Sequence, residues 1–314
     1  MTLLDTVLDR SVIGGYSRLG YAIRSRKWHR PAPGSLVGRT VVVTGATSGI
    51  GAAVAARIAA LGGRPILVGR DSHRAEKVRA SILDGQPSAA VEIELADVSD
   101  LSQVRELANR LTGHEVDGIV HNAGVMPPDR TESADGHELS LATHVLGPVL
   151  LTELLAPQLA SADDPRVVFM SSGGMYTAAL PADDLEYRSG DYRGARAYAR
   201  SKRVQVALLP ILAERWPNVM VAGMHPGWVD TPGVADSLPG FRRVTGPLLR
   251  SAQEGADTAV WLTSTEPTPR SGLFWHDRAP RPTHYFGGSD DCLTEVWREV
   301  AEACGIAETK ASRS

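Results

Sequence analysis

Short runs of β-branched residues alternate with longer helical stretches from about residue 38 onward. Strands are predicted at 39–44, 65–69, 90–95, 118–121, 166–171, 219–225 and 273–275. Helices are predicted at 50–61, 72–84, 101–111, 136–160, 196–215, 252–263 and 291–307. This alternation is typical of a parallel sheet with crossover helices. We therefore expect an α/β fold: one doubly wound, Rossmann-type parallel-sheet domain at 37–314, preceded by a helical N-terminal arm at 1–36.

The overall composition is that of an ordinary soluble domain. The 314 residues are 43% hydrophobic and 22% charged, and the net charge of −3 gives no reason to expect a nucleic-acid partner. No run approaches the roughly 18 apolar residues that span a bilayer. Cys292 and Cys304 lie on one predicted helix, about 18 Å apart, which is too far for a disulfide. These features favour a cytoplasmic location.

The arm is open to two interpretations. Apolar residues recur there with helical spacing and several cations follow, namely Leu3, Leu4, Val7, Leu8, Val12, Ile13, Arg18, Arg24, Arg26, Lys27 and Arg30. One hypothesis is an amphipathic helix that makes peripheral contact with a membrane surface. The other, which we favour, is an arm packed on its own domain or on a partner subunit, so oligomerisation stays open.

A glycine-rich turn separates the first strand from the first helix. Gly45, Gly49 and Gly51 lie in the sequence T-G-A-T-S-G-I-G at 44–51. Without side chains, the backbone can turn sharply and approach a pyrophosphate, which then meets the positive end of the helix. The turn, placed between V-V-V and an alanine-rich helix, predicts a dinucleotide site.

The residue after the second strand indicates which dinucleotide binds. An acidic residue there favours a free ribose 2′-hydroxyl, whereas an arginine accommodates a 2′-phosphate. This chain has Gly69 and Arg70 at that point, so we expect NADP(H) to be favoured over NAD(H). Asp71 is the one caution, and its alternative role is a helix cap.

The sequence Y-A-R-S-K places Tyr198 and Lys202 four residues apart on a predicted helix. That spacing is one helical turn, so both side chains would point to the same site. Upstream, a predicted strand ends at Ser171 and Ser172. A phenol, an ammonium and a hydroxyl beside a dinucleotide turn are the parts of a hydride-transfer enzyme.

In this order the motifs resemble the short-chain dehydrogenase/reductase superfamily, from about residue 40 to 235. Asn122-Ala123-Gly124 is similar to the family's N-N-A-G, with His121 in the first position. Beyond the three glycines and Arg70, the resemblance implies cofactor contacts from Thr47, Ser48, Ile50, Asp97, Val98, Asn122, Ala123, Gly124, Tyr198, Lys202, Pro226, Gly227, Val229 and Thr231.

The resemblance also implies the catalytic roles. Tyr198 would exchange a proton with the substrate oxygen, and Ser172 would hydrogen-bond that oxygen. Lys202 would hold the nicotinamide ribose and lower the tyrosine pKa from about 10. Ser172 and Tyr198 are about twice as far apart as is usual in the family. Tyr187 and Tyr192 lie between them, but neither has a lysine four residues later.

His144 departs from the family pattern. It stands in T-H-V-L-G at 143–147, where the family has an asparagine. The family helix is distorted there, and a backbone carbonyl holds a water that connects to the lysine. We expect a proton relay to persist, with His144 itself as a candidate proton shuttle. The competing interpretation is a weakened or lost relay.

Further segments resemble one branch of the superfamily, that of dehydrogenase/reductase SDR family member 12. They are G-Y-S-R-L-G-Y at 15–21, S-S-G-G-M at 171–175, M-H-P-G-W-V-D-T-P-G-V at 224–234, G-A-D-T at 255–258 and F-W-H-D-R-A-P-R-P-T-H at 274–284. The resemblance implies no established substrate.

Two function hypotheses follow. The first is an NADP(H)-dependent oxidoreductase that interconverts a carbonyl and an alcohol on a lipophilic substrate. Its pocket would draw on loops 173–195 and 226–247, with Met175, Trp228 and Trp275 as apolar candidates, although ordinary packing explains each of these residues equally well. The second is a catalytically weak or inactive NADP(H)-binding regulatory protein. No metal is expected, because the nine histidines form no ligand-spaced cluster.

Overall fold

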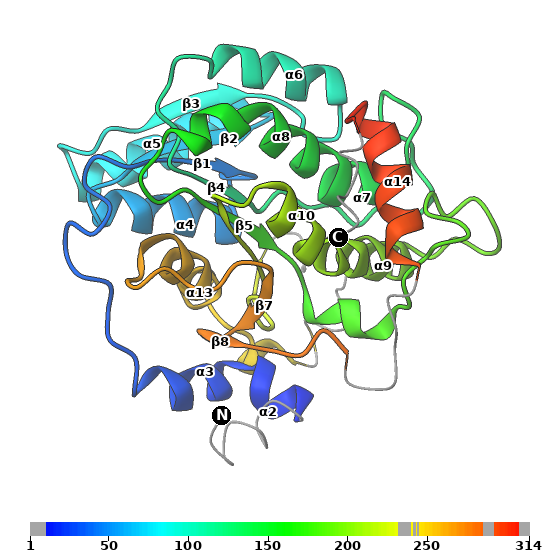
Figure 1. Ribbon diagram of the computed structural model, residues 1–314. Helices are drawn as coiled ribbons and strands as arrows, with labels where there is room; N and C mark the ends of the chain where they lie inside the picture. The colour runs from blue at the N-terminus through cyan, green and yellow to red at the C-terminus, as the bar shows by residue number, and fades with distance from the viewer. Residues whose placement is uncertain (1–10, 232–239, 241–242, 244, 285–291, 308–314) are drawn as a thin grey trace.

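One eight-stranded sheet organises the chain (Figure 1). The computed structural model describes residues 11–231, 240, 243, 245–284 and 292–307. Its strands are β1 (Thr40–Thr44), β2 (Arg64–Gly69), β3 (Glu92–Leu95), β4 (Gly118–His121), β5 (Arg166–Met170), β6 (Met220–Met224), β7 (Leu273–His276) and β8 (Ala279–Pro280). They lie in the order β3-β2-β1-β4-β5-β6-β7-β8, and β8 alone runs antiparallel to its neighbour. The predicted doubly wound fold is confirmed.

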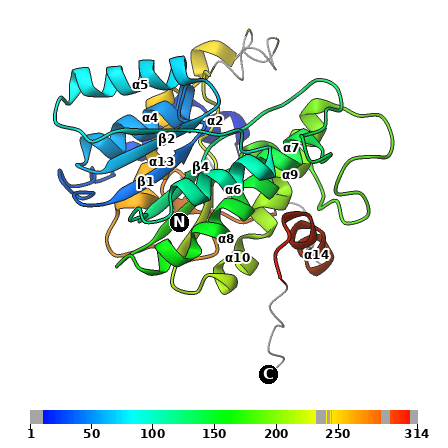
Figure 2. The ribbon, with the colours of Figure 1, turned by 90° about the horizontal axis from the view of Figure 1, so that it is seen from above.

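Helices cover both faces of the sheet (Figure 2). One face carries α4 (Gly49–Ala60), α5 (Ser72–Gly85) and α13 (Ala252–Ser264). The other carries α6 (Leu101–Arg110), α7 (Leu139–Leu141), η1 (Ala142–Leu146), α8 (Gly147–Ala160), α9 (Gly194–Ala207), α10 (Leu209–Arg215) and α14 (Leu293–Cys304). The short 3-10 helices η2 (Gly173–Thr177) and η3 (Gly246–Leu248) lie in loops. The sheet thus separates two hydrophobic cores.

Burial on both faces explains why the central strands were recognisable. Every residue of β1, β4, β5 and β6 is buried. Parallel strands covered by helices on both sides are selected for continuous apolar runs. Because these strands are parallel, their carboxyl ends lie together at one edge of the sheet.

Two predicted helices are interrupted. The helix expected at 136–160 contains the π-helix η1, a distortion common at functional sites. The helix expected at 196–215 divides at Leu208, next to Pro210 near the start of α10. Proline has no N–H to donate, so it is tolerated in the first turn of a new helix.

The arm lies against its own domain. The short helices α2 (Val12–Tyr16) and α3 (Arg18–Ser25) sit beside β7 and β8 in Figure 1. The predicted apolar positions 3, 4, 7 and 8 lie outside the described residues, as does half of loop 226–247. Among the described residues, Leu139–Ala160 is long and apolar enough to cross a membrane, but 78% of its apolar window is buried inside the domain. Such burial is typical of a core helix.

Candidate active site

Three of the four predicted catalytic side chains, those of Ser172, Tyr198 and Lys202, converge at the carboxyl edge of the sheet. Ser172 follows the end of β5, and its hydroxyl oxygen accepts from the Gly174 N–H at 3.1 Å. Tyr198 and Lys202 lie one turn apart on α9, with the lysine Nζ 5.8 Å from the tyrosine ring centre. The strand end and the helix therefore aim a hydroxyl, a phenol and an amine at one place.

Lys202 is deeply buried. Its side chain is 2% exposed, and Nζ donates to the carbonyl of Met170 at 2.6 Å. Burial lowers the pKa of Lys202 from 10.5 to about 7. The amine is therefore poised to change its charge near neutral pH.

The pKa of Tyr198 shifts in a direction that the sequence did not predict. Burial raises the pKa of the phenol, and a hydrogen bond with Ser172 only partly opposes that shift. The predicted lowering of the Tyr198 pKa by Lys202 is not seen in the protein alone. Burial lowers the pKa of Lys202 to about 7, so the amine is largely neutral at the higher pH where the phenol ionises. The protein therefore favours the protonated phenol, which is the form that can donate to a carbonyl oxygen.

His144 lies inside the π-helix η1 and is completely buried. Its Nε2 accepts from the Val125 backbone N–H at 3.0 Å, so the ring proton belongs on Nδ1. That nitrogen lies 2.8 Å from the Ser201 hydroxyl oxygen. The His144 carbonyl accepts from Nε2 of Gln205 at 2.8 Å. Both ring nitrogens are thus engaged in fixed hydrogen bonds.

These contacts weigh against the predicted shuttle role of His144. Burial, and then the nearby Lys202, hold the pKa of the imidazole well below its usual value. The ring stands edge-on to Tyr198, with centroids 5.1 Å apart. A neutral imidazole with both nitrogens occupied supports the tyrosine and the 122–125 loop by packing and hydrogen bonding.

The glycine turn is tightly packed against neighbouring backbone. A Cβ at Gly45 would lie 2.7 Å from the Ala123 Cα, and one at Gly51 would lie 2.3 Å from the Gly45 carbonyl oxygen. Gly45 and Gly49 also have positive φ angles, 65° and 53°. Ser48 precedes α4 without a side-chain bond to it, so the first N–H groups of the helix point to the edge where a phosphate would bind.

The Asn122 segment braces this turn. Nδ2 of Asn122 donates to the carbonyls of Thr44 and Gly45, at 3.1 and 3.2 Å. His121, in the family's first asparagine position, is buried and lies with Nε2 2.8 Å from the Thr152 hydroxyl. Burial lowers the pKa of His121 to about 3, so it remains neutral. The segment is therefore a structural support for the cofactor turn.

Arg70 and Asp97, both predicted to contact the cofactor, pair with each other. Nη1 of Arg70 lies 3.0 Å from Oδ2 of Asp97, and the arginine side chain is 66% exposed. Asp71 caps α5 by accepting from the Arg74 N–H at 3.0 Å, which confirms its alternative role. A guanidinium, rather than a free carboxylate, therefore stands at the end of β2.

A groove beside the glycine turn adds two cations that the sequence analysis missed. Its volume is about 330 Å³, and its lining includes Thr47 and Gly49 from the turn and Arg74 and Lys77 from α5. The sequence could have revealed both cations, because they lie just after the second strand, on the helix that Asp71 caps. Arg74 also pairs with Asp71, its Nε lying 3.4 Å from Oδ2, so the groove brings two cations and one carboxylate close to the turn.

Two of the apolar pocket candidates are corrected by the structure. Met175 is fully buried in the core on the α8 face, and Trp275 is 7% exposed in the core on the α4 face. Apolar side chains near a strand end serve a core and a pocket equally well, so spacing could not separate the two. Trp228 is half-buried at the strand edge.

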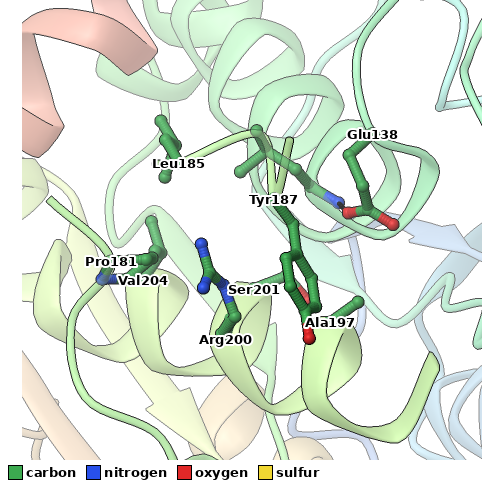
Figure 3. A pocket seen from close by; sticks show the side chains of 9 residues that line it. Glu138, Pro181, Leu185, Tyr187, Ala197, Arg200, Ser201 and Val204 are labelled. Carbon is green, nitrogen blue, oxygen red and sulfur yellow. Dashed lines mark hydrogen bonds between the residues drawn. The ribbon is translucent and has the colours of Figure 1, made fainter. Parts of the chain in front are cut away.

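Tyr187 and Tyr192, two of the three tyrosines in the long Ser172–Tyr198 connection, are structural. Figure 3 shows Tyr187 beside Arg200 and Glu138, around a hollow on the outer side of α9 that has no room for a water molecule. The Tyr187 hydroxyl donates to the carbonyl of Asp191 at 2.8 Å, and that of Tyr192 donates to Glu138 at 2.8 Å. Both hydroxyls thus bond to neighbouring protein groups, whereas Tyr198 has Lys202 one helical turn away.

Known proteins resemble the chain in sequence and in fold. The family model described as short chain dehydrogenase matches residues 39–182. Dehydrogenase/reductase SDR family member 12 of Bos taurus is 39% identical over 280 residues, 86% of each chain. Retinol dehydrogenase 13 of Mus musculus is 30% identical and covers 88% of this chain and 87% of its own. A structure from Beutenbergia cavernae, assigned as an NAD(P) dependent gluconate 5-dehydrogenase with NADP bound at low occupancy, is 27% identical, with a TM-score of 0.61 over 74% of this chain and 92% of that one.

Proposed function

Because the chain belongs to the short-chain dehydrogenase/reductase family and resembles its member 12, it is a carbonyl/alcohol oxidoreductase, and we propose that it uses NADP(H) on a lipophilic substrate. The observation that carries the proposal is the convergence of Ser172, Tyr198 and Lys202 beside a glycine turn. The nicotinamide would lie beside these three groups: a phenol that can donate a proton, a hydroxyl that can hydrogen-bond the substrate oxygen, and a buried amine.

The residues divide the work of carbonyl reduction. The bound cofactor supplies the hydride. Tyr198 is protonated at neutral pH, since burial raises a pKa that is ordinarily about 10. It donates its Oη proton to the substrate oxygen. Ser172 hydrogen-bonds the same oxygen and stabilises its developing charge. Lys202, with a pKa of about 7, returns a proton toward the phenolate.

Replacing Tyr198 with phenylalanine tests the mechanism. The change keeps the ring and removes the proton donor, so turnover should fall at least about 100-fold, the scale of general acid catalysis. NADPH oxidation across a panel of lipophilic ketones and aldehydes is the assay, with Tyr192→Phe as the matched control. Undiminished turnover in the Tyr198 variant would contradict the assignment.

The preference for NADP(H) is proposed from charge. Arg70, Arg74 and Lys77 lie at the end of β2 and the start of α5, where they would meet a 2′-phosphate. NADP bound in the Beutenbergia cavernae structure is consistent with this proposal. Arg70→Asp should reverse the ratio of kcat/KM for NADPH and NADH. An unchanged ratio would refute the assignment.

The proposed lipophilic substrate rests on the similarity to retinol dehydrogenase 13. The hollow drawn in Figure 3 has no room even for a water molecule, so we propose that the reacting carbonyl instead approaches over the strand ends, where Ser172 and Tyr198 lie. Chain-length dependence of kcat/KM over a series of aliphatic aldehydes tests this. A flat series would favour a small polar substrate.

A second candidate is an NADP(H)-binding protein with weak or no catalysis. The observation that favours it is the His144 carbonyl, which already accepts from Gln205 at 2.8 Å in the region where the family holds a relay water. Tight NADPH binding without turnover, equal in the wild type and Tyr198→Phe, would support this candidate over the enzyme.

We also propose a cytoplasmic location, with the arm serving its own domain rather than a membrane. Cys292 and Cys304 are both free thiols, as the helical spacing predicted. Leu19 is 59% exposed on α3, while Tyr16 and Arg24 of the arm are buried. Liposome co-sedimentation that Leu19→Ser abolishes would contradict this assignment, and sedimentation velocity would establish whether the chain associates.

A further inference from the structure

Three sequence segments that the mechanism does not use meet in one interface. They are 15–21 in the arm, 255–258 in α13, and 274–281 in the β7–β8 hairpin. Nε of Arg278 donates to Oδ1 of Asp257 at 2.7 Å, and the Tyr21 hydroxyl lies 3.5 Å from Oδ2 of the same carboxylate. Nη1 of Arg278 donates to the carbonyl of His29 at 2.7 Å. The branch-specific segments are therefore parts of a single contact between arm and domain.

A buried ion cluster holds this interface closed. The Asp277 side chain is 1% exposed and accepts from Nη1 of Arg24 at 2.8 Å. The same carboxylate accepts from Nη1 of Arg250 at 2.6 Å and from Nη2 at 2.8 Å. Arg24 belongs to the arm, whereas Arg250 follows the loop after β6. Breaking these ion pairs is costly, because it leaves the buried Asp277 carboxylate without a compensating charge.

The arm backbone is bound as firmly as its side chains. The Gly15 carbonyl accepts from Nη2 of Arg250 at 3.0 Å and lies 3.2 Å from Nε2 of His276. The Tyr16 carbonyl accepts from the backbone N–H of Trp228 at 2.8 Å. The arm is thus hydrogen-bonded directly to the turn that follows β6.

The ring of Tyr16 reaches both loops that border the predicted active site. It is 3% exposed and stands edge-on to Trp228, with centroids 6.3 Å apart. A Cβ at Gly173 would lie 2.8 Å from Cε2 of Tyr16, and one at Gly227 would lie 2.6 Å from its carbonyl oxygen. Gly173 directly follows Ser172, so the ring packs behind both the serine turn and the Pro-Gly-Trp turn.

We propose that Tyr16 is a positioning residue, and that the clasped arm holds the 172–173 and 226–228 turns in their productive places. The inference rests on the proposed function, since it concerns the same active site. Tyr16 acts through Ser172 and Trp228, and the Arg24–Asp277–Arg250 cluster fixes Tyr16.

The test compares variants of the full-length protein. Tyr16→Ala removes the ring, Tyr16→Phe keeps it, and Leu19→Ser changes an outward-facing residue of the same arm. Arg24→Met loosens the arm while Arg250 still pairs with Asp277, so it serves where Tyr16→Ala folds poorly. The readouts are kcat, KM and NADPH affinity, with hydrogen exchange of peptides 171–177 and 224–231.

Tyr16→Ala should lower kcat by about 10- to 100-fold, the loss typical of a misplaced reacting group. Exchange should quicken in both peptides and remain unchanged in 40–60. Tyr16→Phe and Leu19→Ser should match the wild type. Unchanged exchange and turnover in Tyr16→Ala, or equal losses in Leu19→Ser, would overturn the proposal.

Hydrogen exchange also tests this inference independently of the proposed function. If no protein turns over any carbonyl, including the wild type, the oxidoreductase proposal fails. Faster exchange in 171–177 and 224–231 of Tyr16→Ala and Arg24→Met would still support the positioning role. Identical exchange in all proteins would refute it.

Discussion

Lys202→Met should stabilise the protein near neutral pH while removing its activity. The lysine side chain is 2% exposed, and burial lowers its pKa from 10.5 to about 7. The unfolded chain keeps the ordinary pKa, so between pH 7 and 10.5 it binds a proton that the folded protein releases. Stability of the wild type therefore rises with pH across that window.

The size of the stability difference follows from the pKa shift of Lys202. At 1.36 kcal/mol per pKa unit, burying the amine costs up to about 4 kcal/mol at pH 7 and about 1 kcal/mol at pH 10. Methionine has a similar length and no charge, so it removes this cost. It also removes the donor to the Met170 carbonyl, a loss of about 1–3 kcal/mol. The variant should be the more stable protein at pH 7, and its advantage should vanish or reverse by pH 10.

Urea unfolding of both proteins at pH 7, 8.5 and 10 measures the effect. Taking the difference in unfolding free energy at each pH cancels the other titrating groups, which the two proteins share. A difference that stays constant with pH would refute the reasoning, because it would mean that Lys202 titrates normally in the folded state. A less stable variant at every pH, with a constant gap, would point to packing alone.

Two further changes test the supports of the site. Gly51→Ala would place a Cβ 2.3 Å from the Gly45 carbonyl oxygen, so NADPH binding, measured by fluorescence, should be lost while Ala60→Ser binds normally. His144→Ala removes the acceptor of the Val125 N–H and should lower the unfolding free energy by about 1–3 kcal/mol. Because His144 is neutral, the pH profile of turnover from 5.5 to 7.5 should keep its shape; a lost inflection would restore the shuttle hypothesis.

The sheet was predictable because local pattern and burial coincide in parallel strands. The predicted strands at 118–121 and 166–171 match β4 and β5 to within one residue. The two-residue β8 was not predicted. It depends on a tight hairpin in which Asp277 and Arg278 take left-handed conformations, with φ of 51° and 55°. Such short pairs leave no periodic signal.

The site was predictable in its parts and less so in its chemistry. One helical turn between Tyr198 and Lys202, placed after a strand end, was enough to bring them together. The direction of the Tyr198 pKa shift was not accessible, because it depends on how completely neighbouring elements exclude water. Likewise, only the packed structure shows that Val125 and Ser201 occupy both nitrogens of His144.

Sequence alone was sufficient for whatever depends on neighbours along the chain: the order of strands and helices, the glycine turn, and the tyrosine–lysine spacing. Tertiary structure decided what depends on residues far apart in the chain. Tyr16 bonds to Trp228, and Arg24 shares a carboxylate with Arg250, across more than half of the sequence. Helical and strand periodicity reflect backbone geometry, which is local, whereas burial and charge pairing arise only when distant segments exclude water together.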